Sequence, residues 1–244
     1  MKKINNRKIK IVSLISRQWS LEINKRLIDK LKEINFYLYV KKNLNFSKRS
    51  TVINKLNKKH IKKINEIKPD LIFTYGWSDY LPTNLRNIAP CLILHPSKLP
   101  KYRGGSPIQN QIIDNVNNSA VSILYAEKNL DSGNILYQSS LSLDGYLDDI
   151  LNRIIEKGVI GSIKIIRSYK KNNLKSRKQN DKIATFYKRR TPEQSKISLK
   201  DFKKKEAKYF YNLVRGLQHP YPIAFIECKN KTKLYLNKVS LKDK

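Results

Sequence analysis

The stretch Cys91–Pro107, CLILHPSKLPKYRGGSP, sets an apolar run beside a loop that is rich in proline and glycine. The run CLIL is typical of a buried strand, and His95 follows it directly. Two internal prolines stiffen the loop, and Ser106 with Pro107 forms a helix start, with serine as N-cap and proline at the first helical position. The stretch therefore predicts strand, rigid loop and helix, with a histidine at the carboxyl end of the strand.

The residues before this stretch alternate between strand and helix patterns. Apolar runs predict strands at residues 8–15, 36–40 and 71–75, and apolar residues at helical spacing predict helices over 20–34, with Ser20 as N-cap, and over 53–64. Strands that alternate with helices favour a parallel sheet with helices on both of its faces. We therefore expect an α/β fold with a mostly parallel sheet.

The residues after the stretch predict two more strands, a long helix and a small appendage. AVSILYA (120–126) and NILYQ (134–138) read as extended, and residues 147–166 carry a long helical periodicity. Residues 167–183 are basic without apolar rhythm and predict a linker, a solvated crossing between subdomains. A helix beginning at Ser198 and a hairpin of 223–227 with 233–239 follow. We expect a catalytic domain at 1–166, a linker at 167–183 and a short C-terminal subdomain at 184–244.

The composition limits the kinds of partner. Lys and Arg total 51 against 19 Asp and Glu, which gives a formal net charge of +32 in 244 residues. Such a charge attracts nucleic acid or phosphorylated metabolites, although compositional drift towards Lys, Asn and Ile produces the same excess. No apolar run is long enough for a membrane span, so we expect a cytoplasmic protein. Two cysteines are too few for a disulfide framework or a zinc site, and we expect no metal.

The first strand-to-helix connection, SLISRQWSLEI, contains no glycine. It therefore lacks the glycine-rich turn that brings backbone against a dinucleotide pyrophosphate, which argues against a nicotinamide or flavin enzyme. In parallel sheets the ligand crevice lies beyond the carboxyl ends of the strands. The unusual side chains at two such ends are those of 75–77, Tyr-Gly-Trp, and 95–97, His-Pro-Ser.

Asp131 follows His95 by 36 residues, in a loop after the neighbouring predicted strand. An aspartate that bonds an imidazole holds its tautomer and raises its basicity, which suits proton movement in acyl transfer. From the residues alone, Asp131 fits an ordinary Asp-Ser-Gly turn equally well. A lone histidine is also more often structural than catalytic.

Two segments resemble a known family. LHPSKLPKYRGGSPIQ (94–109) and AVSILYAEKNLDSGNILYQ (120–138) resemble the folate-dependent formyltransferases, a family that includes methionyl-tRNA, glycinamide ribonucleotide and sugar-nucleotide formyltransferases. The resemblance implies a Rossmann-like domain that binds N10-formyltetrahydrofolate, whose formyl carbon is attacked by a substrate amine. It assigns proton transfer and oxyanion support to His95, and the tuning of that histidine to Asp131.

One position departs from the family motif. The family has an asparagine two residues before the histidine, where its amide supports the developing oxyanion, and this chain has Ile93. An oxyanion donor typically contributes about 10²–10³ in rate. Three alternatives follow: another group takes over the oxyanion, the enzyme is slow, or the chain is a binding protein that has lost activity.

The resemblance also implies the ligand contacts. For the folate, the segment TYGWSDYLP and the loop 126–130 give these candidates: Tyr75, Gly76, Trp77, Leu81, Ala126 and Leu130. For the second substrate, the loop after His95 and the segments 184–198 and 211–225, which resemble the sugar-nucleotide branch, give these: Ser97, Arg103, Gly104, Gly105, Arg189, Arg190 and Arg215.

The acceptor expected first is a nucleotide-linked amino sugar. The arginine candidates suit its diphosphate, because a guanidinium binds phosphate with two parallel hydrogen bonds. Methionyl-tRNA is the second expectation, and it depends on the basic surface, because only about one hairpin of sequence follows residue 227 where the tRNA enzymes have a complete barrel. A homodimer is possible on this evidence.

Overall fold

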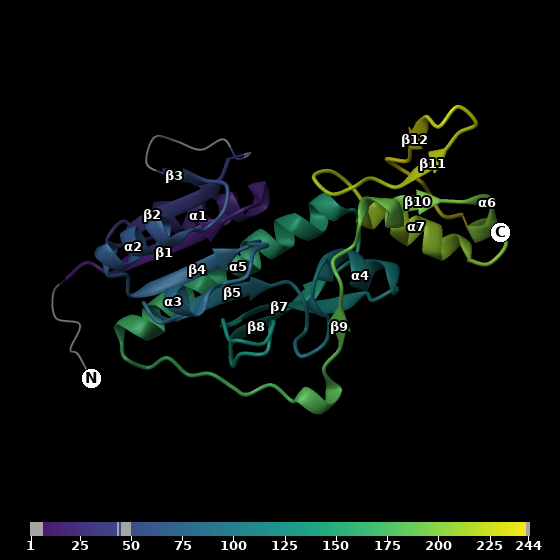
Figure 1. Ribbon diagram of the computed structural model, residues 1–244. Helices are drawn as coiled ribbons and strands as arrows, with labels where there is room; N and C mark the ends of the chain where they lie inside the picture. The colour runs from purple at the N-terminus through teal and green to yellow at the C-terminus, as the bar shows by residue number, and fades with distance from the viewer. Residues whose placement is uncertain (1–6, 43, 45–49, 243–244) are drawn as a thin grey trace.

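The computed structural model describes residues 7–42, 44 and 50–242, so residues 1–6 of the expected first domain and 243–244 of the last lie outside it. A seven-stranded sheet in the order β3-β2-β1-β4-β5-β7-β8 forms the centre (Figure 1). Its strands are β1 (Lys10–Ile15), β2 (Asn35–Lys41), β3 (Ser50–Ile53), β4 (Leu71–Tyr75), β5 (Cys91–His95), β7 (Asn118–Tyr125) and β8 (Ile135–Ser142). The first five in that order are parallel, whereas β7 is antiparallel to both β5 and β8. The predicted mostly parallel sheet is confirmed.

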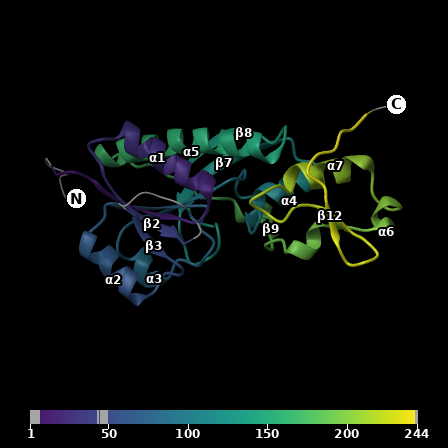
Figure 2. The same ribbon diagram turned by 90° about the horizontal axis from the view of Figure 1, so that it is seen from above.

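Helices cover both faces of the sheet, as expected. In Figure 2, α1 (Gln18–Lys30) and α5 (Leu147–Lys170) lie on one side, with α2 (Lys58–Ile67) and α3 (Thr83–Arg86) on the other. The strand sequences explain the two layers, because successive side chains point to opposite faces. In β1, Ile11 packs in the cluster under α1 and α5, whereas Val12 packs in the cluster under α2 and α3.

The C-terminal part is a helix packed on the catalytic half and a small sheet. Helix α7 (Ala207–Gly216) packs against α4 (Pro107–Ile113), and a separate turn of helix, α6 (Leu199–Phe202), precedes it. The expected hairpin is present as β11 (Phe225–Glu227) and β12 (Lys233–Tyr235), and β10 (Lys196–Ile197) extends it to three strands. A further short strand, β9 (Phe186–Tyr187), pairs with β6 (Arg103–Gly104) of the loop after His95.

Two expected helix starts in the first half of the chain are wrong. Ile53 ends strand β3, and α2 begins only at Lys58, after Asn57 accepts the backbone N–H of His60. The N-cap of α1 is Arg17, and Ser20 is the third helical residue, whose Oγ accepts the Arg17 N–H. Before α2, apolar periodicity continues through residues that local hydrogen bonds remove from the helix, whereas in α1 the serine expected as the cap lies inside the first turn.

The expected linker is neither fully irregular nor simply solvated. Its first residues belong to α5, which continues to Lys170. Further along, Arg177 exchanges backbone hydrogen bonds with Ile135, and the buried Gln179 donates to the carbonyls of Asp131 and Gly133. The segment therefore supports the loop that carries Asp131. No helix in the described part of the chain has the length and apolarity needed to cross a membrane.

Candidate active site

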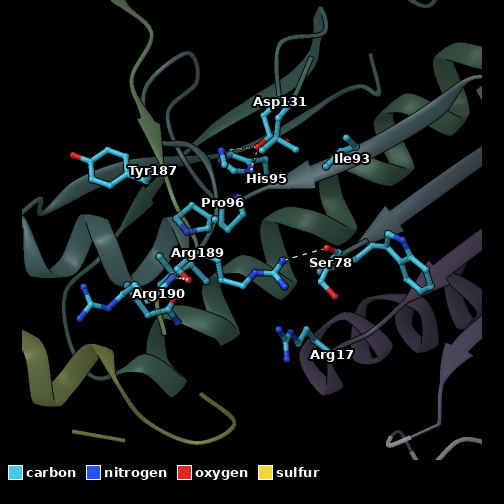
Figure 3. Close-up of a pocket in the computed structure, with 18 of the residues that line it drawn as sticks. Arg17, Ser78, Ile93, His95, Pro96, Asp131, Tyr187, Arg189 and Arg190 are labelled. Carbon is cyan, nitrogen blue, oxygen red and sulfur yellow. Dashed lines mark hydrogen bonds and ion pairs between the residues drawn. The ribbon is translucent and has the colours of Figure 1, made fainter. Parts of the chain in front are cut away.

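His95 and Asp131 lie together beside the carboxyl end of β5. His95 ends β5, and Asp131 lies in the connection from β7, the strand that pairs with β5. Nδ1 of His95 is 3.5 Å from Oδ2 of Asp131, and both side chains are 6% exposed (Figure 3). The predicted proximity is therefore present as a close buried pair, at a distance longer than an ordinary hydrogen bond.

The other ring nitrogen of His95 is fixed by the loop that follows the strand. Nε2 lies 2.8 Å from the carbonyl oxygen of Tyr102. A carbonyl oxygen only accepts hydrogen bonds, so Nε2 carries the proton in this arrangement. In the neutral ring, Nδ1 then presents its lone pair beside the Asp131 carboxylate, and it is the nitrogen free to take up a proton.

Asp131 is oriented by the backbone of the same loop. Its Oδ2 accepts the N–H of Gly104 at 2.8 Å. Gly104 has φ +98°, and a Cβ built there would lie 2.3 Å from the carbonyl oxygen of Tyr187. Glycine is therefore required here both by the backbone angle and by the close approach of β9.

Two tyrosines hold β9 against the loop. The rings of Tyr102 and Tyr187 stack with centroids 4.7 Å apart, and both hydroxyls donate to Oδ2 of Asp114, at 3.1 and 2.8 Å. Desolvation and the bond to Asp114 both raise the pKa of each phenol. Because Tyr102 also supplies the carbonyl that binds His95, the tyrosine pair ties the C-terminal half to the histidine.

A cavity of about 660 Å³ opens in front of His95 and Asp131. Its walls come from the carboxyl ends of β4 and β5, the start of α4, the β7–β8 connection, and the segments 187–191 and 220–222. Residues from both halves of the chain therefore face one space, as in Figure 3. A cavity of this size fits a small-molecule substrate.

Five of the six folate candidates line this cavity: Gly76, Trp77, Leu81, Ala126 and Leu130. Tyr75 does not. Its side chain is fully buried on the opposite face of β4, where its hydroxyl bonds Ser162 of α5 at 2.8 Å. Alternation along the strand explains this correction, because Thr74 and Gly76 face the cavity and Tyr75 must face the core.

Four of the seven candidates for the second substrate line the cavity: Gly104, Gly105, Arg189 and Arg190. The other three have structural partners, which corrects the expectation for them. Ser97 donates to the carbonyl of Lys101. Arg103 is 2% exposed and bonds Gln179 and Asp181 of the linker.

Arg215 is the third corrected residue. Its guanidinium is buried and donates to the carbonyls of Leu143 and Gly145, 2.6 and 2.8 Å away. Desolvation lowers its pKa, and the two carbonyls satisfy its donors. Arg215 therefore joins α7 to the turn before α5 and does not face the cavity.

Several lining residues were not predicted. Arg17 lies in the connection after β1, whose sequence was informative only through its lack of glycine. Its guanidinium lies over the ring of Tyr221, 5.4 Å from the centroid. Gln109 lines the cavity from α4. The helix-start motif that contains Gln109 could have indicated this residue as a cavity residue. Tyr221 comes from a distant segment, and no local pattern in the sequence marks it.

Ile93 lines the cavity two residues before His95, in the position where the family has asparagine (Figure 3). Its side chain packs against two apolar clusters, one under α2 and α3 and one around Leu99 and Leu124. The site therefore has no side-chain donor at this position. A group from elsewhere must support an oxyanion formed here.

Comparison with known proteins agrees with this geometry. Residues 2–166 match the model of the formyl transferase family. The chain belongs to the formyl transferase family. It is 35% identical over 169 residues to a methionyl-tRNA formyltransferase from Halalkalibacterium halodurans, with 68% of this chain and 52% of that protein covered. The chain thus spans about half the length of the curated relatives that it matches.

Two solved structures are similar over nearly the whole chain. A methionyl-tRNA formyltransferase from Clostridium thermocellum has a TM-score of 0.76 at 26% identity, covering 96% of this chain and 94% of that one. A likely sugar N-formyltransferase from Mycobacterium tuberculosis has a TM-score of 0.78 at 17% identity, covering 97% and 99%. The second likeness shows a shared fold and nothing about the substrate.

Proposed function

We propose that this member of the formyl transferase family moves a formyl group from N10-formyltetrahydrofolate to an amine. The observation that carries the proposal is the buried His95–Asp131 pair facing a substrate-sized cavity at the sheet edge. Buried acid–base pairs in clefts are characteristic of catalytic sites.

The reaction requires one proton to move between two nitrogens. The amine nitrogen attacks the formyl carbon, a new C–N bond forms, and the bond from that carbon to N10 of the folate breaks. The amine loses a proton and the departing N10 gains one. Nδ1 of His95 carries this proton, because Nε2–H is committed to the Tyr102 carbonyl. The Asp131 carboxylate stabilises the ring while it is charged.

The folate end of the cavity has the groups that a pterin needs. Trp77 offers an indole N–H that is buried and has no hydrogen-bond partner among the described residues. Leu81 supplies an apolar wall, and the backbone of 126–130 borders the same space. An aromatic, a leucine and unpaired donors suit a flat ring with polar edges.

For the acceptor, we place a nucleotide-linked amino sugar first. The support is the substrate-sized cavity, with Arg189 and Arg190 on its wall together with the glycines of the loop after His95. Arg189 reaches across the opening and donates to the carbonyl of Ser78 at 3.2 Å (Figure 3). A small acceptor with a diphosphate matches this space and its charge.

Methionyl-tRNA is the second candidate acceptor. Curated relatives at 30–35% identity carry that name, and the net charge of +32 suits a nucleic acid. The two acceptors differ in how binding responds to salt. Binding of tRNA through several phosphates weakens steeply with ionic strength, whereas a single diphosphate releases few counterions.

The decisive experiment is incubation with N10-formyltetrahydrofolate and, in parallel, nucleotide-linked amino sugars and methionyl-tRNA. Mass spectrometry then scores the addition of one formyl group, and His95→Ala serves as the control that should lose it. Formylation of an amino sugar supports the first acceptor. Formylation of methionyl-tRNA alone overturns it, and tetrahydrofolate binding without any transfer favours a binding protein.

A further inference from the structure

Several residues that line the cavity carry hydrogen-bond donors without a partner among the described residues. In the described part of the chain, four buried side-chain atoms without a partner belong to cavity-lining residues: Nε1 of Trp19, Nε1 of Trp77, Nε2 of Gln109 and Nε of Arg190. All four are N–H groups. Buried polar groups are normally paired, so the cavity is complementary to a ligand that brings several acceptor oxygens.

Two of these donors come from segments that meet at the start of α4. Gln109 is the third residue of the helix and is 2% exposed. Arg190 donates its backbone N–H to Oγ of Ser106, the residue that precedes the helix, at 3.1 Å. The strand pairing of β6 with β9 brings the two segments together, although 81 positions separate the residues in the sequence.

The guanidinium of Arg190 is short of negative partners. One of its nitrogens donates to the carbonyl of Gln194, and no carboxylate lies within ion-pair distance among the described residues. Burial lowers the pKa of Arg190, because desolvation penalises the charged form. By contrast, another arginine of this region, Arg103, is neutralised by Asp181 at 2.7 Å. A partly buried cation without an ion-pair partner points to an anionic ligand.

We propose that Gln109 and Arg190 together form an oxyanion subsite that holds a phosphate group of the acceptor. Arg190 supplies the charge and the Nε–H, and Gln109 supplies the neutral amide N–H₂. This inference rests on the proposed function only in calling the ligand the acceptor. The binding of a phosphate group can be measured without any formyl transfer.

The subsite also orients the acceptor. The wall formed by α4 and the segment 189–191 borders the same cavity as His95 and the folate candidates at the ends of β4 and β7. A phosphate anchored on the α4 wall leaves the rest of the acceptor free to extend towards His95. Gln109 is therefore a binding residue that determines which acceptors are accepted.

The test measures binding of uridine diphosphate, inorganic pyrophosphate and tetrahydrofolate to the full chain by calorimetry at one ionic strength. The variants are Gln109→Met, Arg190→Gln and the double variant. The matched controls are Gln218→Met and Arg26→Gln, whose side chains bond elsewhere and do not line the cavity. Melting temperatures verify that each variant is folded, and Arg190→Lys retains the charge without the Nε–H.

We expect each single variant to weaken uridine diphosphate and pyrophosphate binding about tenfold or more, since a hydrogen bond to a charged group is lost. The double variant should lose less than the product of the two, because both residues hold one group. Tetrahydrofolate binding and both controls should stay within about twofold of the wild type.

Three results would overturn the proposal. The first is unchanged diphosphate binding in both single variants. The second is a loss of tetrahydrofolate binding instead, which would assign the residues to the carboxylates of the folate. The third is that the wild type binds neither uridine diphosphate nor pyrophosphate. Failure of the proposed function looks different. In that case diphosphate binding still depends on both residues, but no amine is formylated.

Discussion

Gly104 donates its backbone N–H to the carboxylate of Asp131 at 2.8 Å, and so connects the loop after His95 to the loop that carries its partner. The bond holds Oδ2 where it also faces Nδ1 of His95. On its other side, Gly104 is pressed against the carbonyl of Tyr187 in β9. The geometry of the proposed acid–base pair therefore depends on a segment more than fifty residues away from either member.

Gly104→Ala should destabilise the protein and reduce turnover. The new Cβ would lie 2.3 Å from the Tyr187 carbonyl, and φ of +98° is strained for alanine. We expect a loss of about 1–3 kcal/mol in the free energy of unfolding, measured by denaturant titration. Gly216→Ala is the control, because its Cβ would meet only the Ile112 side chain at 3.0 Å. Equal effects at both sites would contradict the close contact with β9.

His95→Gln should lower kcat by about 10²–10⁴ and leave tetrahydrofolate binding nearly unchanged. The reason is that Nδ1 carries the proton in the proposed reaction, while the folate contacts come from other residues. Asp131→Asn should lower kcat as well, because the charged ring loses its stabilising carboxylate. Steady-state kinetics and calorimetry measure the two effects. A variant of His95 with normal kcat would exclude it as the proton carrier.

Ile93→Asn tests what supports the oxyanion. We infer that another group, such as the protonated ring of His95, fills this role, so we expect unchanged or lower turnover. If a donor is missing instead, the new amide should raise kcat by up to about 10²–10³. Ile93→Val is the control for lost packing, since Ile93 contacts two apolar clusters. An increase with asparagine alone would show an incomplete site.

Because the thiol of Cys91 is buried, we expect the protein to lose stability at alkaline pH. Burial raises the pKa of this thiol to about 12, whereas the unfolded value is about 8.5. The unfolded chain then releases the proton first, so stability is full below about pH 8.5 and falls as the pH rises towards 12. Over that window the wild type should lose up to about 1.4 kcal/mol per pH unit relative to Cys91→Ala. Urea titrations at several pH values measure the difference, and parallel curves would contradict it.

The sequence by itself determined the order of the main elements and indicated where the proposed reaction takes place. Alternating strand and helix patterns predicted the parallel part of the sheet, and the motif around His95 predicted the edge where the site lies. Local chemistry was sufficient for these conclusions, because burial patterns and helix starts depend on neighbouring residues. The Asp131 assignment needed the family motif as well, since an Asp-Ser-Gly turn has the same composition.

Only the tertiary structure decided which predicted residues face the cavity. Tyr75 and Gly76 are adjacent in sequence and point to opposite sides of the sheet. Arg190 and Arg215 are both basic residues of the C-terminal half. Arg190 lines the cavity, whereas Arg215 is held by main-chain carbonyls of the turn before α5. Charge and residue type do not separate such cases.

The physical reason is that the cavity wall is made by contacts far apart along the chain. The segments that carry Gln109 and Arg190 come together because β6 pairs with β9, and Arg17 reaches the ring of Tyr221 across 204 positions. A local pattern reports how a residue sits on its own helix or strand. The partner that a side chain finds, or fails to find, is set by how distant segments pack, and this packing leaves the donors of Gln109 and Arg190 free for a ligand.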